Sequence, residues 1–174
     1  DALAVLDPKR SDCTYPFKEL CGCGVGFKLI QGLLQHQGKE VNEIIAYLDF
    51  VAVAIAADIV PIVGENRVLA FLGLQQLNIH PRPGLKAIMR DKPTKQIISD
   101  ILFGIAPRIN AAGRMKHGLD AVKLLLSESG EEAKKIAQEV EIYNTSRRKL
   151  EKEITEEALT QILENEEENN ATNV

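Results

Sequence analysis

The feature that most constrains the fold is a nearly continuous apolar segment at residues 41–57, which ends in the run FVAVAIAA. The segment is long enough for a helix, and a helix that is apolar on nearly every side has to be covered on nearly every side. It falls short of the roughly 18 to 20 uninterrupted apolar residues that a membrane span requires. We therefore expect this helix in the core of a water-soluble fold.

Helical spacing of apolar residues predicts further helices on both sides of this segment. They are expected at 25–38, 65–77, 83–89 and 120–126, and the third has proline in its first turn, where the missing N–H costs nothing. Residues 2–6, ALAVL, are typical of a short buried strand, and the proline, serine and aspartate that follow predict a loop. The expected fold is mostly α-helical with a short N-terminal strand.

Residues 130–168 predict one long amphipathic helix. Its apolar and small residues recur by threes and fours on a background of Glu, Lys and Gln, at Ala133, Ile136, Val140, Tyr143, Leu150, Ile154 and Ala158. Because this stripe is narrow, the helix can pack along one surface or bridge two domains. Residues 169–174 can bury nothing and are expected to fray.

The composition indicates a folded domain rather than a disordered chain. The chain has 174 residues, of which 45% are hydrophobic, enough for one domain with a core. Three cysteines are an odd number in a chain without a signal-peptide pattern, which favours buried free thiols, a reducing compartment and a cytoplasmic location. The sequence does not begin with methionine, so we expect it to be an excerpt of a longer protein.

The net charge of −4 is unevenly distributed along the chain. Residues 130–174 hold 12 acidic and 6 basic residues, whereas residues 1–129 hold 13 acidic and 15 basic ones. Within 82–116, eight basic residues stand against Asp91 and Asp100: Arg82, Lys86, Arg90, Lys92, Lys95, Arg108, Arg114 and Lys116. Such a patch can track phosphates, and it can equally be an ordinary solvated surface.

Asp58 is the one carboxylate at the end of the apolar segment, in the stretch AADIVP. Burying an unpaired carboxylate there would be costly, so a partner is expected. Two interpretations remain open. Asp58 either ends the helix by accepting hydrogen bonds from nearby amides, or it is a ligand of a hard divalent cation, which prefers carboxylate oxygen.

The stretch FGIAPRINAAGRMKHG, at 103–118, alternates hydrophobic anchors with cations and an amide. We interpret it as a small-residue turn that presents Arg108, Asn110, Arg114 and Lys116 to a ligand, with Gly113 allowing close approach. Planar guanidinium groups bind phosphate oxygens bidentately, and an asparagine can donate to phosphate. The alternative is structural, with the arginines bound to helix C-termini or to Asp100 and Asp120.

Four stretches, in order, resemble the RecJ single-strand-specific exonucleases of the DHH phosphoesterase superfamily. They are LDPKRSDCTYPFKELCGCGVGFKL, LDFVAVAIAADIVPIVGENRVLAFLGL, RPGLKAI and FGIAPRINAAGRM. The resemblance covers essentially the whole chain, including the long helix. It implies that residues 1–129 are the C-terminal portion of an α/β DHH domain, without the upstream DHH motif, and that residues 130–168 are the helix connecting it to the next domain.

The same resemblance implies roles for individual residues. Asp58 matches the last metal-ligand aspartate of the DHH domain, and the other ligands lie outside this chain. Arg108, Asn110 and Arg114 match the family's arginine motif, which implies contacts to the DNA backbone or terminal phosphate, and Lys116 adjoins it.

The implied activity is metal-dependent hydrolysis of single-stranded DNA from its 5′ end, in repair and recombination. The enzyme would use a two-metal site of Mn²⁺ or Mg²⁺. Its partners would be single-stranded DNA and repair proteins, and it would not bind a membrane. Residues 1–174 alone are expected to be inactive. The alternatives are a DHH phosphoesterase acting on short oligonucleotides or cyclic dinucleotides, and a non-catalytic DHH-derived scaffold that binds DNA or proteins.

Overall fold

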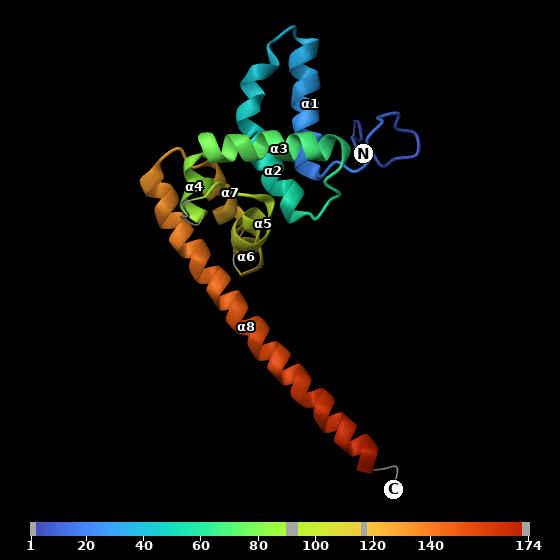
Figure 1. Ribbon diagram of the computed structural model, residues 1–174, viewed down its shortest axis with the longest axis vertical. Helices are drawn as coiled ribbons and strands as arrows, with labels where there is room; N and C mark the ends of the chain where they lie inside the picture. The colour runs from blue at the N-terminus through green and yellow to red at the C-terminus, as the bar shows by residue number, and fades with distance from the viewer. Residues whose placement is uncertain (1–2, 90–93, 116–117, 172–174) are drawn as a thin grey trace.

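The computed structural model describes residues 3–89, 94–115 and 118–171, and these form a bundle of helices from which one long helix projects (Figure 1). The helix α2, Leu48–Ala57, lies at the centre of the bundle, as the apolar segment predicts. Its side chains are buried almost all round, and Ala52 and Ile55 have no exposed surface. The expected mostly helical fold is confirmed.

Two further helices pack against α2. The helix α3, Gly64–Ile79, crosses it closely, and a Cβ atom added at Gly73 would lie 2.1 Å from the Leu48 carbonyl oxygen. The helix α1, Gly22–His36, forms a hairpin with the 3₁₀ helix η1, Val41–Tyr47, and this hairpin extends from the bundle (Figure 1). Only Ile44 of η1 is buried, so the expected helix at 41–57 divides at the point where the chain enters the core.

The remaining short helices complete the other side of the core. They are α4 (Pro83–Ile88), α5 (Ile98–Asp100), the π-helical turn η2 (Ile101–Ile105), α6 (Ala106–Met115) and α7 (Gly118–Leu126). Arg82, just before α4, joins it to α2: its Nε and Nη2 donate to the buried Asp49 carboxylate at 2.7 and 2.9 Å. Arg82 is therefore a structural member of the basic patch.

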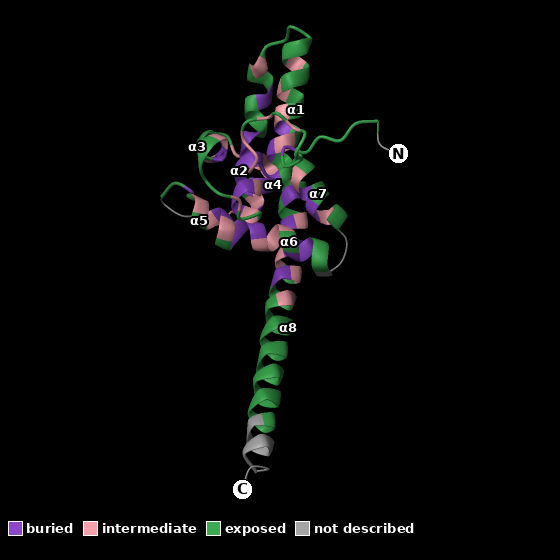
Figure 2. Cartoon of the chain, turned by 90° about the vertical axis from the view of Figure 1, so that its right-hand side faces the viewer, coloured by how far each residue is buried: buried purple, intermediate pink, exposed green. Residues whose placement is uncertain are grey.

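The helix α8, Gly130–Ala171, is packed at its start and bare further on (Figure 2). Ala133, Ala137 and Val140 are buried against the bundle, whereas Leu150 and Ile154 are exposed. The bare part has ion pairs four residues apart, such as Lys152 with Glu156 at 3.6 Å, which support an isolated helix. The helix also continues past residue 168, where fraying was expected, and residues 172–174 lie outside the described residues.

The expected N-terminal strand is not formed. Residues 3–7 have no regular structure, and the side chains of Leu3, Val5 and Leu6 are exposed. A strand needs a neighbouring strand to satisfy its backbone groups, and no other strand occurs among the described residues. The short apolar run therefore does not by itself form a strand.

No helix among the described residues is both long and apolar enough to cross a membrane.

Candidate metal-ligand and nucleic-acid-binding site

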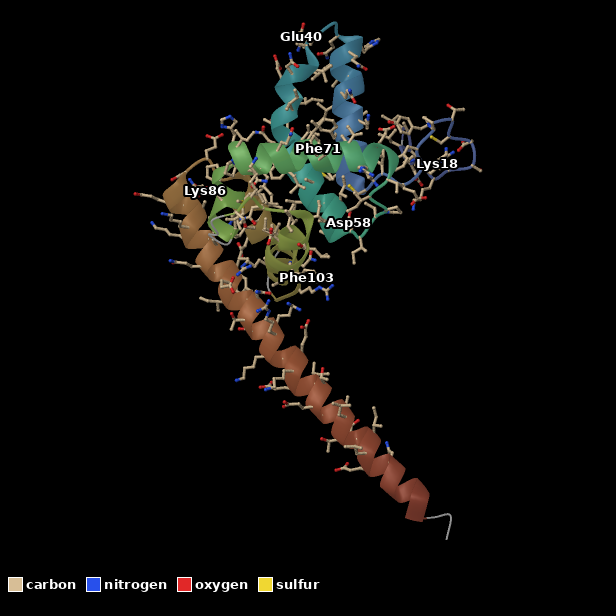
Figure 3. The ribbon with its side chains drawn as sticks, in the orientation of Figure 1. Lys18, Glu40, Asp58, Phe71, Lys86 and Phe103 are labelled. Carbon is tan, nitrogen blue, oxygen red and sulfur yellow. The ribbon has the colours of Figure 1, made fainter. Side chains whose placement is uncertain are left out.

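Asp58 lies at the C-cap of α2, where its backbone N–H still donates to the Ala54 carbonyl at 2.9 Å. The carboxylate is exposed, which corrects the expectation of a buried charge. It makes no hydrogen bond or ion pair with any other residue that the structure describes, so the helix-ending interpretation through side-chain bonds to amides is also not observed. Figure 3 shows Asp58 at the end of α2 that lies away from the tip of the α1–η1 hairpin, where Glu40 is labelled.

The backbone beyond Asp58 is strained. Ile59 has φ = 54°, a left-handed conformation that β-branched residues rarely adopt. The Ile59 side chain is 79% exposed, so burial does not compensate for this conformation. Strain of this kind persists only where surrounding contacts hold the chain in place, and it turns the chain sharply just after Asp58.

A concavity of about 410 Å³ brings Asp58 together with Asn110 of α6. Its walls come from α2, α6, α7 and the first turn of α1, and they are otherwise mostly apolar: Phe50, Val53, Ala54, Ala57, Ala106, Ile109, Val122, Leu125 and Leu126. Two residues that are 52 positions apart in the sequence, and were both expected at a site, thus share one hollow.

Cys23 lines the same hollow, although the sequence indicated only a buried free thiol. Desolvation by neighbouring groups raises the pKa of the thiol to about 11, and the charges of Asp58 and Asp49 act in the same direction. Cys23 therefore stays protonated near neutral pH and is a poor nucleophile. Cys23 lies in the first turn of α1, two residues after the N-cap Cys21. A cysteine at a helix start can face away from the core, and this position was the signal that sequence reasoning could have used.

The stretch expected to be a turn is the helix α6. Pro107 comes two residues after the π-helical turn η2, whose altered hydrogen bonding accommodates a residue without an N–H in a continuous helix. Ala111 and Ala112 are fully buried, so the small residues serve packing rather than a bend. Phe103, expected as an anchor, is 69% exposed, and the side chain of Met115 lies outside the description.

Arg108 points inward, whereas the sequence interpretation has it presented to a ligand. Its Nε donates to the Glu141 carboxylate of α8, and its Nη1 donates to the Gly104 carbonyl at 2.7 Å. The side chain is 14% exposed. This geometry favours the structural alternative for Arg108. The acidic partner is Glu141, however, and not Asp100 or Asp120 as expected.

Asn110 and Arg114 have the opposite character. Both are exposed, and they stand four residues apart on α6 and so lie on the same face of the helix. Neither side chain has a hydrogen-bond or ion-pair partner among the described residues. Lys116, the last residue of the expected set, lies outside the described residues.

The fit to a divalent metal is partial. Asp58 offers an exposed, unpartnered carboxylate, which is the donor that a hard cation prefers. However, the described residues contain no group of three or more His, Cys, Asp or Glu that could hold a metal ion. This chain can thus supply one ligand, the Asp58 carboxylate, to a metal ion.

Known proteins with similar sequences come from one family. The single-stranded-DNA-specific exonuclease RecJ of Bacillus subtilis is 39% identical over 168 residues, which are 93% of this chain and 20% of that protein. RecJ of Escherichia coli is 35% identical over 173 residues, covering 91% of this chain and 30% of that protein. No family model matches the chain.

Solved structures agree with the sequence matches. RecJ from Thermus thermophilus in complex with Mn²⁺ has a TM-score of 0.75 and 30% identity, over 83% of this chain and 22% of that one. The chain matches a segment of RecJ proteins. A manganese-bound exonuclease RecJ has a TM-score of 0.77 at 32% identity, over 85% of this chain and 38% of that one. The resemblance found in the four sequence stretches is confirmed, and the chain spans about a fifth to two-fifths of the length of the RecJ proteins that it matches.

Proposed function

We propose that this chain is the part of a metal-dependent, 5′-to-3′ single-stranded-DNA exonuclease that supplies one metal ligand and a phosphate-binding helix face. The observation that carries the proposal is the shared hollow, where the unpartnered carboxylate of Asp58 and the exposed amide of Asn110 face the same space. The RecJ relatives, some of which were crystallised with Mn²⁺ or Mg²⁺, support it.

In this proposal Asp58 holds one of two divalent ions, Mn²⁺ or Mg²⁺, with the other ligands coming from elsewhere in the parent protein. Bound there, the metal would activate a water molecule as the nucleophile and neutralise charge on the scissile phosphate. Residues 1–174 alone would then show no nuclease activity. Action in DNA repair and recombination, a cytoplasmic location and possible repair-protein partners belong to the same proposal and rest on the resemblance.

The helix α6 contributes positioning. Asn110 donates an amide N–H to a phosphate oxygen near the metal ligand, and Arg114, one turn further, binds the DNA backbone or terminal phosphate with its planar guanidinium group. Lys116 adds charge next to them. Contacts to the backbone are indifferent to base sequence, as an exonuclease moving along a strand requires.

The test is Asp58→Ala in the full-length parent, with Glu40→Ala as the matched control. Glu40 is an exposed carboxylate near the tip of the α1–η1 hairpin, far from Asp58 (Figure 3). Asp58→Ala should abolish turnover of a 5′-labelled single strand yet keep DNA binding within a few-fold, because a metal ligand is lost and a phosphate contact is not. Glu40→Ala should change neither. Near-normal turnover in Asp58→Ala would refute the proposal.

A further inference from the structure

Asn66 is a buried polar residue where the start of α3 meets the turn after Asp58 and the segment before α1. It lies in the first turn of α3, and its side chain has no exposed surface. Its Nδ2 donates to the Pro61 carbonyl at 3.0 Å and to the Glu19 carbonyl at 2.7 Å. One amide group thereby joins three segments of the chain.

Both carbonyls belong to segments that lead into walls of the hollow. Pro61 is three residues past Asp58, on the far side of the strained Ile59. Glu19 is two residues before Cys21, where α1 begins, and the first turn of α1 brings Cys23 into the same hollow as Asp58. Asn66 therefore fixes the turn that carries Asp58 relative to the opposite wall.

The amide of Asn66 is not explained by stability alone. Its Oδ1 is buried without a hydrogen-bond partner among the described residues. This buried unsatisfied oxygen has a free-energy cost that the two hydrogen bonds donated by Nδ2 have to offset. Such departures from good packing concentrate where function requires a fixed geometry.

We propose that Asn66 is a positioning residue for the metal ligand Asp58, acting through the Pro61 carbonyl. This inference rests on the proposed function of Asp58. Without the Nδ2 bonds, the left-handed conformation at Ile59 relaxes, and the Asp58 carboxylate no longer stays in the orientation that binds the cation.

The junction has a second set of bonds that survives loss of Asn66. The Tyr15 hydroxyl donates to Glu65 at 2.8 Å, and Lys28 forms an ion pair with the same carboxylate at 2.8 Å. These bonds continue to join α1, α3 and the N-terminal segment in an Asn66→Ala variant. That variant should therefore fold.

Asn78 provides a matched control on the same helix. Its Nδ2 also donates to two carbonyls, of Leu74 at 2.7 Å and Gln96 at 3.1 Å, and its Oδ1 accepts from the Gln96 N–H. It holds the other end of α3, away from the Asp58 turn. Asn66→Ala and Asn78→Ala thus remove the same kind of bond at opposite ends of one helix.

The experiment measures Mn²⁺ binding to the full-length parent by isothermal titration calorimetry, beside its unfolding temperature. Asn66→Ala should weaken Mn²⁺ binding about 10-fold or more, as loss of groups that orient metal ligands commonly does. Asn78→Ala should lower the unfolding temperature about as much as Asn66→Ala does and leave the Mn²⁺ affinity unchanged, because Asn78 orients no metal ligand. If Asn66→Ala also leaves the Mn²⁺ affinity unchanged, Asn66 is only structural and the inference is refuted.

Two further variants keep the test decisive. Asp58→Ala, titrated in parallel, separates the two claims: if it binds Mn²⁺ like the wild type, the proposed function itself fails. If instead Asp58→Ala loses affinity and Asn66→Ala does not, only the positioning role is refuted. Should Asn66→Ala not fold, Asn66→Ser keeps a short donor and takes its place. Faster amide exchange at Ile59, Val60 and Ile62 is then the expected accompanying signal.

Discussion

Replacing Arg108 by alanine should destabilise the protein rather than weaken its binding to DNA. The guanidinium group loses an ion pair with Glu141, which is 45% exposed and so contributes only about 0.5–1 kcal/mol. It also loses a charged hydrogen bond to the Gly104 carbonyl, which contributes about 1.5 kcal/mol. The expected total is about 2 kcal/mol, which lowers the unfolding temperature by about 4–8 °C where residues 1–174 unfold as one cooperative unit within the parent.

The matched comparison is Arg114→Ala, four residues from Asn110 on the exposed face of α6. This substitution should leave the unfolding temperature within about 1 °C, because surface changes rarely exceed about 0.5 kcal/mol. It should reduce the slope of log affinity for a single-stranded oligonucleotide against log salt by about 0.7, the loss of one phosphate contact. Arg114→Lys should recover only part of the affinity, since the bidentate fork is lost.

The assay is fluorescence anisotropy of a labelled oligonucleotide over a salt series, with thermal unfolding on the same full-length samples. Glu141→Gln removes the charge of the partner of Arg108 and should lower the unfolding temperature without changing the salt slope. A structural role for Arg108 is excluded if Arg108→Ala lowers the slope by about 0.7 and leaves the unfolding temperature unchanged.

The remaining predictions concern packing, strain and titration. Gly73→Ala should lower stability by about 3 kcal/mol or more in chemical denaturation, because its Cβ would lie 2.1 Å from the Leu48 carbonyl oxygen. Ile59→Gly should be neutral or stabilise by up to about 1 kcal/mol, since glycine accepts φ = 54°, whereas Ile62→Gly should cost about 0.5–1 kcal/mol in the same assay. Alkylation of Cys23 should quicken about 10-fold per pH unit up to pH 10, because its pKa is about 11; a rate independent of pH there would contradict this.

The sequence predicted the helices well where apolar spacing was strong. Two helices, α3 and α8, form within a few residues of the expected bounds. The central apolar helix α2 forms within the expected range of 41–57. The helix α6 was missed because Pro107 and Gly113 are both turn signals. In the fold, however, Pro107 lies near the start of α6. Gly113 lies on an open face, where an added Cβ atom would have nothing within 4 Å.

The candidate site could be predicted only in part. Asp58 was identifiable as an isolated carboxylate, but its exposure depends on where α2 ends relative to its neighbours, which the sequence does not specify. Arg108 and Arg114 look alike in sequence, and only the position of α8 turns one of them towards Glu141. Asn66 did carry a signal: it stands in register with Leu69, Gly73 and Leu77 on the buried face of α3.

Anomalous diffraction from crystals of the full-length parent grown with Mn²⁺ would test directly whether Asp58 ligates a divalent cation. We expect an anomalous peak within direct coordination distance of an Asp58 carboxylate oxygen, on the side of the hollow that Asn110 shares. Loss of that peak in Asp58→Ala crystals would agree with it. A manganese peak elsewhere, with the Asp58 carboxylate bonded only to protein or solvent, would contradict the claim.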